Sequence, residues 1–255
     1  WLLSFGFASL LVVTIEGGFR LGRRHASRIG DAGRGEVTTI QVAVLSLLAL
    51  LLGFSFAMAE TRYQTRHDLV LAESNAIGTA ILRAQLLPEP ARSELTQLLD
   101  RYVDARIAFH GAGADRARLR RASDEAERLQ AELWERGRAA AAGDSHAVTT
   151  GLLLQSLNDV IDLHAARVVA LENRVPASVI SLLLFVAIIS CGLIGYGSGL
   201  GGERNFVVLL LTVIAFVSVI LLIVDFDRPD RGLIRVPQQS MLRLRHTLSA
   251  PQPRR

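Results

Sequence analysis

Apolar and charged residues are separated into long blocks along this sequence. The block from Ile40 to Ala59 has 20 residues and no charged side chain. As a helix rising about 1.5 Å per residue, it would cross the roughly 30 Å hydrocarbon layer of a bilayer. Core helices of soluble proteins rarely stay apolar over this length. We therefore predict four membrane-spanning helices, at about residues 1–15, 40–59, 177–198 and 206–224.

The long segment between the second and third blocks, residues 60–174, has the periodicity of helices. Apolar residues recur there every three or four positions, and Pro88 and Pro90 interrupt the pattern. The helix over 114–142 has few apolar positions, so we expect it to be solvated or to face a partner. The pattern predicts helices over 61–87, which continues the second membrane helix, over 89–109 and 114–142, and from Asp144 or Ser145 towards Pro176.

An even number of spans places both termini and the segment 60–174 on one side of the membrane, and the connections at 16–39 and 199–205 on the other. Arg residues flank the spans in similar numbers on both sides, so the positive-inside rule does not decide the orientation. We predict an all-α membrane protein with four transmembrane helices. Its helical soluble domain is formed by the second-to-third connection and the C-terminal tail at 225–255, in one architectural unit over 1–255.

The charge balance points to a membrane rather than to nucleic acid. All 28 basic residues are Arg, against 24 acidic residues. The one dense basic patch in the soluble segment, at Arg118, Arg120 and Arg121, has no interleaved aromatic side chain on which bases could stack. Phospholipid headgroups and a solvated helix face explain these cations better. We expect the lipid bilayer, and no nucleic acid, as a partner.

The third apolar block carries the only cysteine, Cys191, and a run of glycines between 192 and 202. One cysteine excludes an intrachain disulfide and a cysteine metal cluster. The glycines resemble a phosphate-binding loop only in composition. In a membrane block they indicate close helix packing followed by a turn.

No catalytic motif occurs in the sequence. Asp159, Asp162 and His164 have the residue types of a metal cluster. A polar flank of an amphipathic helix, with Arg167 and Arg174 as ion partners, is the better interpretation. We predict no enzyme activity, no cofactor and no metal centre.

A candidate cation site follows the fourth apolar block, in the segment DFDRPDRG. Asp225, Asp227 and Asp230 could ligate a hard cation such as Ca²⁺. Arg228 and Arg231 are interleaved and would oppose it. A turn at the membrane interface is therefore the favoured interpretation.

Residues of the second apolar block lie near one helical face because they are four positions apart: Ser46, Leu50, Phe54 and Met58. If several copies of this helix surrounded an axis, this face would form a narrow, mostly apolar throat that controls ions by dewetting. From periodicity alone, packing against lipid or against the other spans is the simpler interpretation.

Short motifs give the chain a family resemblance. LGF at 52–54, followed by TRY at 61–63, resembles the bestrophin ion channels, in which L-G-F on the second membrane helix is followed by T-R-W at the same spacing. The segments LLLGF, RYQTR, ESNAIGTA and LNDVIDLHAARV resemble the bestrophin-like integral membrane proteins of bacteria and plants, a family without settled function. This second resemblance covers nearly the whole chain.

The resemblance implies a homopentamer in which the second helix of each subunit lines a central pore, with a neck at Ser46, Leu50 and Phe54. It also implies conduction of inorganic anions such as chloride, and an inner-membrane location with the helical domain in the cytoplasm. Ser46 departs from the bulky apolar residues usual in that neck. Tyr63 and Gln64 stand where the family has a pair of Trp residues.

The acidic residues at 225–230 only partly match the calcium clasp of animal bestrophins, so calcium gating does not follow from the resemblance. An alternative function of another class is a non-conducting membrane scaffold or sensor, whose helical domain binds a protein partner. Its support is the charged helix over 114–142. The number of subunits separates the two hypotheses, because a channel of this design needs a ring whereas a scaffold could be a monomer or a dimer.

Overall fold

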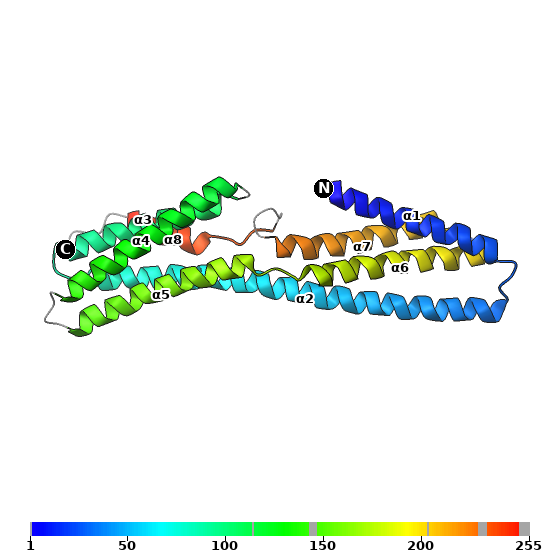
Figure 1. The fold of residues 1–255 in the computed structure, drawn as a ribbon, viewed down its shortest axis with the longest axis horizontal. Coiled ribbons are helices and arrows are strands. Elements are labelled where there is room, and N and C mark those ends of the chain that lie inside the picture. The colour runs from blue at the N-terminus through cyan, green and yellow to red at the C-terminus, as the bar shows by residue number, and fades with distance from the viewer. Residues whose placement is uncertain (1, 114, 143–146, 203, 229–233, 250–255) are drawn as a thin grey trace. The chain divides into compact units, whose positions relative to one another are not determined.

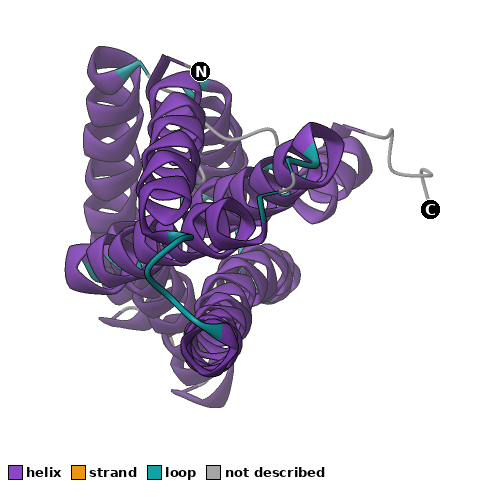
Figure 2. Cartoon of the chain, turned by 90° about the vertical axis from the view of Figure 1, so that its right-hand side faces the viewer, coloured by secondary structure: helices purple, strands orange, loops and turns teal. Residues whose placement is uncertain are grey.

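The computed structural model describes residues 2–113, 115–142, 147–202, 204–228 and 234–249. Figure 2 shows helices and loops over these residues, with no strand, as the sequence predicted. The helices in chain order (Figure 1) are α1 (Leu2–His25), α2 (Asp31–Ala84), α3 (Ala91–Gly111), α4 (Arg116–Ala142), α5 (Ala147–Glu172), α6 (Ala177–Gly201), α7 (Phe206–Asp227) and α8 (Gln239–Ser249).

The chain forms two compact units. The first unit contains Trp1–Thr61 and Arg174–Arg228, and the second contains Arg62–Asn173 and Pro229–Arg255. α2 contributes residues to both units, because the boundary at Thr61 falls inside this helix. The expectation of one architectural unit over the whole chain stays a prediction.

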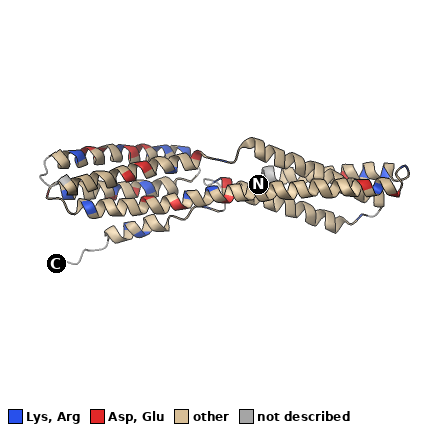
Figure 3. Cartoon of the chain, turned by 90° about the horizontal axis from the view of Figure 1, so that it is seen from below, with Lys and Arg blue, Asp and Glu red and all other residues tan. Residues whose placement is uncertain are grey.

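The first unit contains the apolar parts of the membrane helices. Among the residues that the structure describes, four helical stretches are long and apolar enough to cross a membrane: Phe5–His25, Asp31–Ala84, Val148–Gly201 and Phe206–Asp227. The uncharged parts of the second and third stretches are 40–59 in α2 and 177–198 in α6. Long uncharged stretches along these helices, and dense charges on the helices of the second unit, are visible in Figure 3. This agrees with the four spans predicted from the sequence.

α1 is longer than predicted. We expected a helix that ends at Ile15 and a connection over 16–39, but α1 continues to His25 and α2 begins at Asp31. Its charged extension keeps its polar groups at the surface, where Arg20 Nε lies 2.8 Å from the Glu16 carboxylate one turn earlier. The extension is stabilised by packing on α6, which periodicity within α1 does not reveal.

Glycines allow α1 and α6 to approach at backbone distance. A Cβ atom added at Gly18 would overlap the carbonyl oxygen of Gly192, and one added at Gly195 would overlap the carbonyl oxygen of Ile15. Gly22 and Gly199 make equally close contacts with the facing backbone. Gly18 and Gly22, like Gly195 and Gly199, are four residues apart, which is the small-residue spacing common where membrane helices cross. The close packing predicted for the α6 glycines is therefore confirmed at 195 and 199.

The second unit has its own apolar core, built from one face of each helix. Leu95 and Leu99 of α3 are completely buried, as the predicted three- and four-residue spacing requires. The end of α2 contributes Ile77, and α5 contributes Leu153 and Leu157. The amphipathic helices expected over 61–87, 89–109 and the segment before Pro176 are confirmed.

α4 packs along one face and is exposed along the rest. We expected this helix to be solvated or to face a partner, and it does both: it lies against α3 and α5, where Leu129 and Leu133 are buried, and most of its other residues are exposed. Gly137 allows this approach, because a Cβ atom there would lie 2.7 Å from Leu157 Cδ1. A narrow apolar stripe is sufficient to pack α4 into the bundle, because α3 and α5 both contact that stripe.

The sequence did not predict α8. Met241 of this helix is completely buried in the core of the second unit. Arg245 forms ion pairs with two carboxylates of α3. Its Nη1 lies 2.5 Å from Asp100, and its Nε lies 2.8 Å from Asp104. These long-range contacts position a short helix that local propensity alone would stabilise only marginally.

Replacing Gly18 with Ala tests the α1–α6 crossing. The added methyl group would collide with the Gly192 carbonyl, so we expect a loss of roughly 1–3 kcal/mol in the free energy of unfolding and a lower melting temperature in detergent. Gly17→Ala is the matched control, because it makes the same change one residue earlier with no atom within 4 Å of the added Cβ. Equal melting temperatures for the two variants would contradict the crossing.

Candidate functional site

The predicted throat residues lie on an uncovered face of α2 in the first unit. Leu50 is 54% exposed and Phe54 is 63% exposed, and Ser46 is exposed as well. Met58 differs, because it is half-buried against the core cluster of the first unit. Ser46, Leu50 and Phe54 therefore form the uncovered face in one chain, with Met58 at its edge.

The opposite face of α2 is packed. Leu48, Ser55 and Ala59 are buried, and Leu48 and Ala59 belong to the same core cluster as Leu183 of α6. The helix thus has one face used within its own unit and one apolar face left open. An open face with large apolar side chains needs lipid or other protein surfaces to cover it.

The acidic residues near the end of α7 have another role where they are described. Asp227 is buried, and its Oδ1 accepts a hydrogen bond of 2.7 Å from the backbone N–H of Val175, just before α6 begins. Asp225 lies in the last turn of α7, and Asp230 lies outside the described residues. No group of three potential metal ligands occurs among the residues that the structure describes. The cation site stays a prediction.

The second unit contains a buried charged network centred on Glu73 of α2. The carboxylate is inaccessible to solvent, Arg106 Nε of α3 lies 2.9 Å from its Oε1, and Arg167 Nη1 of α5 contacts its Oε2. The Tyr102 hydroxyl donates a hydrogen bond of 3.0 Å to Oε1. We call Glu73, Arg106, Arg167 and Tyr102, together with Gln130 and His164, the Glu73 network.

The outer members complete the contacts of the Tyr102 hydroxyl. Gln130 Nε2 of α4 donates a hydrogen bond of 3.0 Å to this oxygen, and His164 Nδ1 of α5 lies 3.3 Å from it. Arg106 is positioned by charge and by the ring of Phe109, whose centroid is 5.2 Å from the guanidinium carbon. Its nitrogen atoms have no hydrogen-bond partner within the described part of the chain. The network therefore joins α2, α3, α4 and α5.

Burial and charge together set the protonation of the network. Burial by itself raises the pKa of Glu73, but the charges of Arg106 and Arg167 and the hydrogen bonds outweigh it, so the pKa lies below its ordinary value. Burial, followed by the charge of Glu73, raises the pKa of Tyr102. Burial, followed by the charge of Arg106, lowers the pKa of His164 to about 4. At neutral pH, two guanidinium groups thus share one carboxylate beside a neutral imidazole.

The expected ion partners on α5 are different in the structure. Arg167 is buried and contacts Glu73, whereas Asp159 accepts a hydrogen bond from Gln155 and Asp162 accepts one from Asn158. The interpretation of these two carboxylates as a polar flank agrees with their exposure. The assignment of Arg167 as their partner was wrong, because Arg167 lies on the buried face of the helix.

Sequence reasoning missed Glu73 and Arg106, although a signal exists. Glu73 precedes Ile77 by one turn, and Arg106 follows Val103 by three residues, so both charges fall within apolar stripes. A charged residue inside such a stripe must find a partner when the stripe is buried.

Glu73→Gln tests whether the network stabilises the second unit. The variant leaves two buried guanidinium groups without a counter-charge, so we expect a loss of about 3–5 kcal/mol in the free energy of unfolding. Glu125→Gln is the control, since this carboxylate forms exposed ion pairs with Arg101 and Arg128 and such pairs contribute little. Thermal unfolding in detergent measures both. A Glu73 variant as stable as the Glu125 variant would show that the network is dispensable.

The depressed pKa of His164 predicts a pH dependence. The unfolded chain binds a proton at this residue below about pH 6.5, whereas the folded chain does so only near pH 4. The contribution of His164 to the free energy of unfolding is therefore complete above pH 6.5. It decreases as the pH falls towards 4, by at most roughly 3 kcal/mol. His110, whose pKa is also lowered, acts in the same direction. Melting temperatures between pH 7.5 and 4.5 should fall less steeply for His164→Gln than for the wild type; parallel curves would contradict the assignment.

Comparison with known proteins agrees with this architecture. A family model described as Bestrophin-like domain matches residues 7–241. Among solved structures, the chain is similar to a point variant of a bacterial bestrophin homologue from Klebsiella pneumoniae, with a TM-score of 0.69 and 17% identity over 95% of this chain and 96% of that chain. Another structure of a Klebsiella pneumoniae bestrophin homologue gives a TM-score of 0.64 and 17% identity, over 94% of this chain and 96% of that chain.

No curated protein matches the chain. Identities of this size show a shared fold, and the family model covers most of the sequence and both compact units. The resemblance to the bestrophin-like proteins, inferred from segments such as LLLGF, RYQTR and ESNAIGTA, is confirmed. The chain belongs to the bestrophin-like family of membrane proteins.

Proposed function

We propose that this protein is an ion channel, a homopentamer in which the α2 helices surround a central pore and Ser46, Leu50 and Phe54 form its narrow throat. The observation that carries the proposal is the uncovered apolar face of α2 in a chain of the bestrophin-like family. Lipid could cover such a face in a monomer, but the family relationship favours copies of the same helix arranged around an axis.

The side chains of the face support control by dewetting. Leu50 and Phe54 are large and apolar, so a ring of each would exclude water and ions when narrow and admit them when the side chains move. Ser46 is small and polar, which would make the ring at this level wider and easier to hydrate. Gly53 leaves space beside Phe54, because no atom lies within 4 Å of a Cβ atom added there.

We propose that chloride and similar inorganic anions permeate, and that the protein lies in the inner membrane with its second unit in the cytoplasm. Support comes from the resemblance and from the excess of Arg over acidic residues in the chain. The scaffold alternative is less favoured, because the apolar stripe of α4 is already covered by α3 and α5 of the same unit.

Phe54→Ala tests the throat. Removing the ring of phenyl groups should widen the passage and raise single-channel conductance in planar bilayers. Phe56→Ala is the matched control, since Phe56 lies two residues away on α2 and its ring makes an edge contact with Phe226, with 5.8 Å between centroids. Unchanged conductance after substitution at both Leu50 and Phe54 would refute the throat assignment.

Subunit number and selectivity have separate tests. Electron microscopy of the detergent-purified protein should show particles with five-fold symmetry and an axial hole. Under a potassium chloride gradient, the zero-current potential should move towards the chloride equilibrium potential. Particles of one or two subunits that carry no current would favour the scaffold hypothesis, and a shift towards the potassium potential would overturn anion selectivity.

A further inference from the structure

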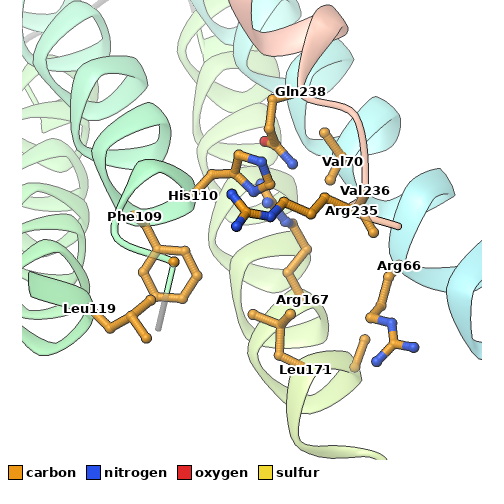
Figure 4. A pocket seen from close by; sticks show the side chains of 12 residues that line it. Arg66, Val70, Phe109, His110, Leu119, Arg167, Leu171, Arg235, Val236 and Gln238 are labelled. Atoms are coloured by element: carbon orange, nitrogen blue, oxygen red, sulfur yellow. The ribbon is translucent and has the colours of Figure 1, made fainter. Parts of the chain in front are cut away.

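A small cavity lies within the second unit and shares Arg167 with the Glu73 network. It has a volume of about 50 Å³ and is bounded by α2, α3, α4, α5 and the segment before α8 (Figure 4). Its polar lining consists of Arg66, His110, Arg167, Arg235 and Gln238, and its other walls are mostly apolar.

The lining is strongly basic. Three guanidinium groups and one imidazole border the cavity, and none of the described lining residues is acidic. Arg167 is 6% exposed and shares the Glu73 carboxylate with Arg106, so its counter-charge is divided between two cations. Arg235 forms no ion pair among the described residues. The cavity therefore has a positive potential that an anion would lower.

His110 lies within reach of the same charges. Burial, followed by the charges of Arg167 and Arg235, lowers the pKa of its imidazole. Both guanidinium groups are thus close enough to His110 to act on it across the cavity. Figure 4 shows the side chains of His110, Arg167 and Arg235 directed to the same region, with Arg66 to one side.

Gln238 adds an unpaired acceptor. Its side chain is 8% exposed, and its Oε1 has no hydrogen-bond partner among the described residues. In Figure 4 the amide points towards the region that His110 and Arg235 occupy. A buried acceptor without a donor costs free energy, so a ligand that brings an O–H group to this position would be favoured.

We propose that this cavity binds a small oxyanion that carries an O–H group, as inorganic phosphate does at neutral pH. Arg167 and Arg235 would donate to its charged oxygens, and its O–H would donate to Gln238 Oε1. A cavity of this volume holds a few water-sized groups, which matches an oxyanion of about five non-hydrogen atoms. Chloride and sulfate lack the O–H donor. The proposal does not depend on ion conduction.

The test measures the melting temperature of the full-length chain in detergent as a function of phosphate concentration, with sulfate at matched ionic strength as the comparison. Phosphate should stabilise the wild type more than sulfate does, because only phosphate pairs with Gln238. Arg235→Gln should weaken the apparent affinity for phosphate about tenfold or more. Arg243→Gln is the matched control, since it removes the same charge from an exposed position on α8 outside the cavity.

Gln238→Met tests the acceptor separately. It should reduce the response to phosphate and leave the response to sulfate unchanged. Glycerol 3-phosphate, whose phosphate group has mostly lost its O–H at neutral pH, should stabilise the wild type less than inorganic phosphate does, and equal stabilisation by the two compounds would overturn the role of the O–H group. No stabilisation of the wild type by phosphate, or equal responses of the Arg235 and Arg243 variants, would overturn the site. Equal responses of the wild type to phosphate and sulfate would overturn the role of the O–H group.

Discussion

The second unit depends on one buried carboxylate that two guanidinium groups share. Glu73 is inaccessible to solvent, and Arg106 and Arg167 reach it from two other helices. Each of these charges would be very costly to bury alone, so they specify how α2, α3 and α5 pack relative to one another. Apolar contacts alone could tolerate sliding of these helices, whereas a charge pair in the interior has a single favourable position.

The same network produces the positive cavity beside it. One carboxylate cannot neutralise two guanidinium groups completely. Part of the positive charge of Arg167 therefore acts on the side that faces His110 and Arg235. Burial keeps this field strong by excluding water. The excess of two buried guanidinium groups over one carboxylate therefore underlies both the stabilising network and the candidate anion site.

The first unit is governed by a different constraint. Apolar helices in lipid gain little from the hydrophobic effect when they associate, so close packing has to hold them together. Gly18 and Gly22 of α1 provide this against Gly195 and Gly199 of α6. α2 uses Leu48 and Ala59 for packing and keeps Leu50 and Phe54 uncovered. The face proposed for the pore is thus one of the apolar faces that the fold of a single chain leaves uncovered.

The sequence by itself determined the four spans, the continuation of α2 beyond Ala59 and the amphipathic helices of the second unit, because uncharged length and apolar periodicity are local properties of the chain. It also contained the short segments on which the resemblance to the family is based. It did not determine the length of α1, the existence of α8 or the packing of α4, since these depend on contacts with residues far along the chain. Only the tertiary structure decided that Glu73, Arg106 and Arg167 meet: periodicity shows which face of a helix a charge occupies, but the partner of a buried charge is set by which other helix covers that face.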